Sequence, residues 1–75
     1  MNKARMKQLE DIATKVGDLR EELEGLLEVE QEYRDNIPEG MQDGEQANRS
    51  DDAIGIMEEA VNSLDDVCEN LRSIE

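Results

Sequence analysis

The sequence contains no histidine, phenylalanine or tryptophan, and it has one cysteine, one proline and one tyrosine among 75 residues. With Cys68 alone, no internal disulfide can form, and without histidine the usual clusters of transition-metal ligands cannot be assembled. Nucleophilic catalysis needs a base beside the nucleophile, and no histidine is present to serve Cys68 in that role. We therefore expect a protein that is not an enzyme and that has neither a metal nor a cofactor.

Long apolar runs are also missing from the sequence. Residues 1–7 are basic, but no stretch after them is apolar enough to cross a bilayer or to form the core of a signal peptide. A single unpaired cysteine suits a reducing compartment. These features predict a cytoplasmic protein with no membrane partner.

Negative charge dominates the residues that are present. The chain has 21 Asp and Glu residues against 8 Lys and Arg residues, a net charge of -13. Direct binding to nucleic acid is not expected, because that affinity rests on neutralising phosphates. A macromolecular partner should instead be basic, since complementary potentials speed encounter and set preference.

Apolar residues in the first half advance in alternating steps of three and four, which is typical of a coiled-coil seam. Glu30 is the one charged residue in this series, and Leu27 and Val29 flank it, so we expect the stripe to shift or widen there. The series is Leu9, Ile12, Val16, Leu19, Leu23, Leu26, Glu30, Tyr33 and Ile37.

The second half has a more regular seam and an additional apolar column. The seam consists of Ile54, Met57, Val61, Leu64, Cys68 and Leu71. The additional column, with residues seven apart, consists of Ala53, Ala60, Val67 and Ile74. A two-helix hairpin needs only the narrow seam, so the column predicts contact with further helices, most simply in a dimer that forms a four-helix bundle. The alternative is that its alanines are merely good helix formers.

The segment Asp35–Gly40 separates the two halves, because Pro38 removes a hydrogen-bond donor and pushes the preceding residue out of helical conformation. Asn48 or Ser50 is then available as an N-cap for the second helix. We expect one all-α domain over residues 1–75, an antiparallel hairpin that associates as a dimer or higher oligomer. Its helices should cover about 3–35 and about 50–74, with a loop at about 36–49.

Six acidic residues of the second half form pairs that repeat every seven residues, about 10 Å apart along a helix. This acid ladder consists of Asp51, Asp52, Glu58, Glu59, Asp65 and Asp66. Such a row of carboxylates could occupy a basic groove that normally holds phosphates, as a DNA mimic does. The alternative is that these acids are solvated flank positions that keep an oligomer soluble.

A different hypothesis places function at the basic residues. An oligomer could sequester a small anionic nucleotide between its protomers through Arg5, Lys7, Tyr33, Arg34 and Arg72. A third possibility is a passive structural or assembly role. Tyr33 occupies a seam position, where it would cap the end of the core or anchor an interface.

The layout around the break resembles a known group of small proteins. Tyr33 precedes the run Asp35-Asn36-Ile37-Pro38-Glu39, a loop with Gly and Gln follows, and the second helix has heptads. In this layout the chain is similar to small uncharacterised helical-hairpin proteins encoded by phages and prophages. The resemblance implies a phage or mobile-element accessory protein in a bacterial host cell, with inhibition of a host enzyme or defence system as a common role.

Overall fold

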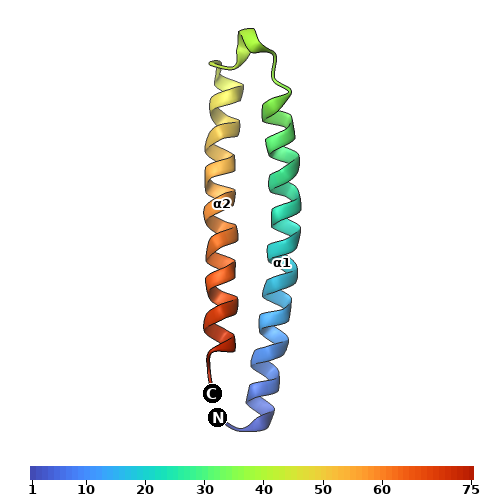
Figure 1. Ribbon diagram of the computed structural model, residues 1–75, viewed down its shortest axis with the longest axis vertical. Helices are drawn as coiled ribbons and strands as arrows, with labels where there is room; N and C mark the ends of the chain where they lie inside the picture. The colour runs from blue at the N-terminus through green and yellow to red at the C-terminus, as the bar shows by residue number, and fades with distance from the viewer.

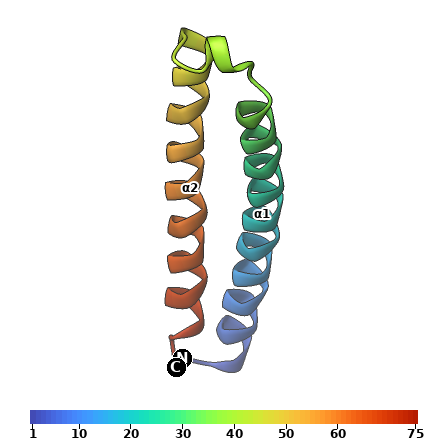
Figure 2. The same ribbon diagram turned by 45° about the horizontal axis from the view of Figure 1, so that its top comes forward.

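A computed structural model describes all 75 residues as two long α-helices joined by a short turn (Figure 1). The helices are α1 (Lys3–Asp35) and α2 (Glu45–Arg72), and a 3-10 turn, η1 (Glu39–Met41), lies between them. The two helices run antiparallel side by side, so both termini lie at the same end (Figures 1 and 2). The Cα atoms extend over 60 × 14 × 12 Å. The predicted all-α hairpin is thus confirmed.

Helix α1 begins and ends where the sequence predicts. The side chain of Asn2, whose backbone is extended, accepts a hydrogen bond of 2.9 Å from the backbone N–H of Arg5 and so caps the helix. The helix ends at Asp35, three residues before Pro38. No helix of the protein combines the length and the apolar character needed to cross a membrane.

Helix α2 begins at Glu45, five residues before the predicted start near Ser50. Gly44, with an extended backbone, is the N-cap, and Glu45 places a carboxylate at the positive end of the helix dipole. Neither predicted cap residue serves as one, because both lie inside the helix. The predicted loop of about 36–49 is correspondingly shorter, since residues 45–49 belong to α2, and Ala47 in the first turn of that helix is fully buried.

The predicted seam of α2 is confirmed. Val61 and Cys68 are buried, and the remaining seam residues are half-buried. The thiol of Cys68 lies 3.5 Å from the backbone carbonyl oxygen of Ala13. Ala13 is itself a fully buried residue. Cys68 is therefore a small core residue, as its seam position indicates.

The predicted seam of α1 is wrong in every second position. Leu9, Val16 and Leu23 face α2 and are half-buried, as expected. The positions between them are shifted by one residue: Ala13, Arg20, Leu27 and Arg34 face α2 in place of Ile12, Leu19, Leu26 and Tyr33. The latter four side chains are between 47 and 59% exposed. The physical reason is that the two arginines reach acidic residues of α2 while their aliphatic stems line the seam.

Candidate functional site

Two arginines of α1 join the helices along one face of the hairpin. Nε of Arg34 lies 2.7 Å from a carboxylate oxygen of Asp51, and its Nη2 donates to the backbone oxygen of Gln42 at 3.3 Å. Arg20 lies two heptads before Arg34 in α1, and its Nε contacts the carboxylate of Asp65. Two members of the acid ladder are therefore occupied by contacts within the chain.

The hydrogen bond to Asp51 is the main reason that the pKa of Arg34 is raised above its ordinary value. Nearby carboxylates, including Asp35 and Asp43, act in the same direction, while desolvation opposes them. The contacts around Arg34 therefore favour its charged form. Its planar guanidinium can hold α1, the turn and α2 together through separate N–H groups.

The other four members of the ladder make no ion pair: Asp52, Glu58, Glu59 and Asp66. All four are exposed. Asp52, Glu59 and Asp66 are seven residues apart on α2, which places them about 10 Å apart in a row along the helix. We call these three residues the free acid row. The structure thus divides the ladder into acids that join the helices and acids that are open to a partner.

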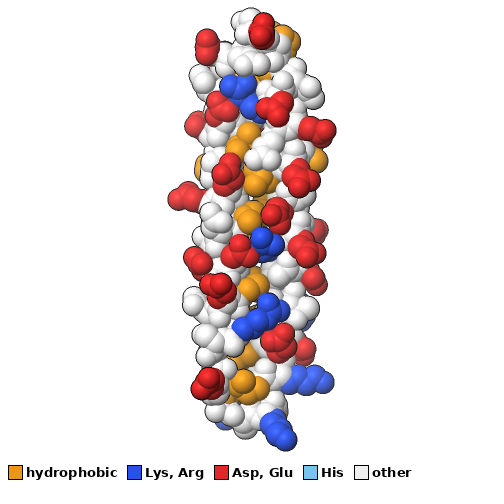
Figure 3. Space-filling view, viewed as in Figure 1, with side chains coloured by type: hydrophobic (Ala, Val, Ile, Leu, Met, Phe, Trp, Pro, Cys, Tyr) orange, Lys and Arg blue, Asp and Glu red, His pale blue; other side chains and the backbone are white.

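Basic residues occupy the middle of this face and acidic residues occupy its edges. Figure 3 shows Lys and Arg side chains at intervals along the line between the helices, with Asp and Glu side chains on both flanks. Arg72 extends this pattern toward the open end of the hairpin, where its Nε lies 3.4 Å from a carboxylate oxygen of Glu10. Only five of the 21 acidic residues take part in an ion pair. The flanks therefore keep most of the negative charge uncompensated.

The residues of the alternative ligand site divide into two groups within one chain. Arg5, Lys7 and Arg72 lie at the open end of the hairpin, whereas Tyr33 and Arg34 lie beside the turn. About 40 Å of helix separates the groups at 1.5 Å per residue. Arg72 and Arg34 also have carboxylate partners already. One hairpin by itself does not bring this set together.

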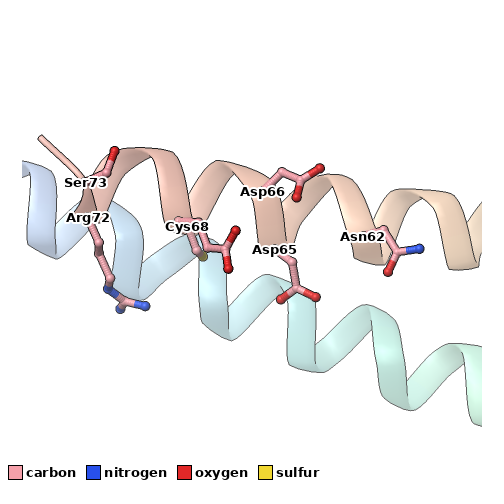
Figure 4. A pocket seen from close by; sticks show the side chains of 7 residues that line it. Asn62, Asp65, Asp66, Cys68, Arg72 and Ser73 are labelled. Carbon is pink, nitrogen blue, oxygen red and sulfur yellow. The ribbon is translucent and has the colours of Figure 1, made fainter.

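The most prominent hollow on the surface runs along α2, from Asn62 to Ser73. Figure 4 shows that Asp65 and Arg72 reach toward α1, while Asp66 and Ser73 point away from it. The polar groups therefore do not converge on one point. No three side chains among Asp, Glu and Cys come close enough together to hold a metal ion.

An exposed apolar surface lies on the hairpin as well. In the predicted oligomer column, Ala53 and Ala60 are half-buried, and Val67 and Ile74 are exposed. Tyr33 of α1 lines the same hollow as Ala53. The exposed residues of α1 therefore lie beside the α2 column. The sequence pattern assigned the α1 residues to the intrachain seam and so did not predict the α1 half of this surface. The expectation that the stripe shifts or widens near Glu30 was the one sign of it.

Searches with protein-family models, against curated proteins and against solved structures gave no match to this chain.

Proposed function

We propose that this chain is a non-catalytic binding protein that presents its acidic flank to a basic partner. The observation that carries the proposal is the free acid row, Asp52, Glu59 and Asp66, which is exposed and makes no ion pair within the chain. A helix that needed these carboxylates only for its own packing would pair them, as it pairs Asp51 and Asp65. A basic partner would compensate the charge of these three acids in a chain whose net charge is -13.

The distribution of cations supports the same function. Four of the five arginines are in ion pairs with acids of the same chain, and three of these lie between the helices. They stabilise the hairpin without covering its flanks. The flanks then offer a rod of regularly spaced carboxylates that can enter a groove lined with Lys and Arg. A nucleic-acid-handling or defence protein of a bacterial host has such a groove, and the chain would act there in the cytoplasm as a phage or mobile-element inhibitor that mimics DNA.

A pull-down from bacterial lysate tests this proposal. The bait is the wild type, compared with a variant carrying Asp52→Asn, Glu59→Gln and Asp66→Asn, none of which breaks an ion pair. The matched control carries Glu39→Gln, Asp43→Asn and Glu75→Gln, which neutralises the same number of exposed acids at the ends of the hairpin. We expect a basic protein to be retained at low salt by the wild type and the control and lost with the row variant. Equal retention by all three baits would contradict the proposal.

A second candidate function rests on the cations that have no partner. Lys3, Arg5 and Lys7 make no ion pair and gather in the first turns of α1. In an oligomer they could surround a small anionic nucleotide. Calorimetric titration of nucleotides into the wild type and into an Arg5→Gln, Lys7→Gln variant tests this function. Binding that is lost only in that variant would favour it over the acidic flank.

A further inference from the structure

We propose that a second copy of this chain docks on the exposed apolar surface that α1 and α2 share. This apolar face consists of Ile12, Leu19, Leu26 and Tyr33 of α1 together with Ala53, Ala60 and Val67 of α2 and the following Ile74. The inference goes beyond the proposed function, because the dimer would form whether or not a basic partner exists.

The antiparallel register sets the two columns beside each other. Tyr33 and Ala53 line one hollow. A step of seven residues keeps a side chain on the same face, and the helices run in opposite directions. Successive steps therefore place Leu26 beside Ala60 and Leu19 beside Val67. At the open end, Arg72 contacts Glu10, which shows that these parts of the two chain segments are still side by side. One further step of seven residues therefore places Ile12 beside Ile74. The apolar face is thus continuous along most of the hairpin.

Charge identifies a second copy as the occupant. The exposed positions next to the α1 column are Lys15, Glu22 and Val29, each three residues after a column member. The corresponding positions on α2 are Arg49, Ile56, Ser63 and Asn70. This border contains one acid and two bases, in a chain whose net charge is -13. Two such molecules repel each other least when these nearly neutral faces meet and both acidic flanks point outward.

Lys15 and Glu22 add a self-complementary feature to the border. They lie seven residues apart on the same edge of α1 and make no ion pair within the chain. An antiparallel arrangement of two copies about a two-fold axis can place the lysine of each opposite the glutamate of the other, as an isologous interface requires. A basic partner would instead be drawn to the acidic flanks.

The size of the face matches what a stable dimer needs. From residue 12 to residue 33, α1 rises about 31 Å, and two helices side by side are about 20 Å wide. Each copy would therefore contribute roughly 600 Å², or roughly 1,200 Å² for both, which is the lower bound for specific, stable interfaces. The four helices would then form an antiparallel bundle.

Sedimentation equilibrium of the full chain tests the proposal. We expect the wild type to have twice the monomer mass of 8.5 kDa. Leu19→Glu should weaken the dimer about 100-fold or more, because two carboxylates would be buried without partners. Met41→Glu is the matched control, since both side chains are 56% exposed and Met41 lies in the turn, away from the face. The control should remain dimeric.

Several outcomes would overturn the proposal. A wild type that is monomeric up to high micromolar concentration would leave the face to a different occupant. A Leu19→Glu variant that dimerises as well as the wild type, or a Met41→Glu variant that dissociates equally, would place the interface elsewhere. If circular dichroism shows that Leu19→Glu has lost its helices, the pair Leu19→Ala and Leu26→Ala decides, since alanine favours the helix. That variant should weaken the dimer about tenfold or more, and an unchanged dimer would equally refute the proposal.

Discussion

The hydroxyl of Ser50 donates a hydrogen bond of 2.7 Å to a carboxylate oxygen of Glu30 across the interface between the helices. Glu30 is the acidic residue that interrupts the apolar seam of α1, and Ser50 is only 4% exposed. The two polar groups satisfy each other inside a seam of aliphatic residues. Because a shift of either helix would leave both without a partner, we infer that the pair helps to set the register of the hairpin.

Replacing Ser50 with alanine should destabilise the hairpin. Ser50→Ala leaves the half-buried carboxylate of Glu30 without its donor, which should lower the free energy of unfolding by about 1–3 kcal/mol. Urea unfolding followed by circular dichroism measures this, with Ser63→Ala as control, because Ser63 is exposed on the same helix and makes no hydrogen bond. Adding Glu30→Leu to Ser50→Ala should recover the loss, since both polar partners are then gone. A Ser50→Ala variant as stable as the control would show that the bond contributes nothing.

The hairpin itself could be predicted from the sequence because the break between the helices and most seam positions are marked by residue type. Pro38 marks the end of α1, and the seam that contains Cys68 follows a regular heptad pattern along α2. The start of α2 could not be predicted, because Ser50 is an equally good cap and hydrogen-bond partner by type. Its actual role depends on Glu30, which is far away in the sequence.

The face of α1 that packs against α2 could not be predicted from the sequence alone either. Arg20 and Arg34 stand in the column that packs against α2, and charged residues ordinarily exclude a column from a seam. Only the positions of Asp65 and Asp51 on the opposing helix make these arginines compatible with the interface. The division of the acid ladder follows from the same contacts, so it too requires the three-dimensional register.

Arg34 should control the order of the turn. Arg34→Gln removes the contacts to Asp51 and to the backbone oxygen of Gln42. Backbone amides at 41–44 should then exchange hydrogen faster, while those near Leu64 in the middle of α2 should be unchanged. Hydrogen exchange by NMR measures both sets. Arg49→Gln is the control, since its ion pair with Glu45 is largely exposed and lies within α2. Equal exchange in both variants would refute the role of Arg34.

Ala13 should not tolerate a larger side chain. It is fully buried, and its backbone oxygen lies 3.5 Å from the thiol of Cys68. Ala13→Leu would force the helices apart and should lower the free energy of unfolding by about 1–3 kcal/mol. Thr14→Leu adds a leucine at the next, exposed position and should change stability little. Comparable stability of the two variants in urea would contradict the close packing of the helices around Ala13.

Neutralising the two kinds of ladder acid should change thermal stability in opposite directions. The variant with Asp52→Asn, Glu59→Gln and Asp66→Asn removes three of the 21 acidic residues without breaking an ion pair. Because self-repulsion in a chain of net charge -13 then decreases, its Tm should rise by about 2–5 °C. Asp51→Asn together with Asp65→Asn removes the partners of Arg34 and Arg20, so its Tm should fall. Thermal melts at low salt and equal protein concentration compare them. Shifts of the same sign would show that the two groups of acids are physically equivalent.

Salt should affect the two proposed interactions in opposite ways. Two copies that meet through the apolar face each carry a net charge of -13, so screening weakens their repulsion while leaving apolar burial intact. The dissociation constant of the dimer, measured by sedimentation between about 0.05 and about 0.5 M NaCl, should therefore fall severalfold. Retention of a basic protein by the acidic flank should decrease over the same range, because that attraction is screened. A dimer that dissociates as salt rises would instead be held by ion pairs, and Leu19 and Leu26 would not be its main contacts.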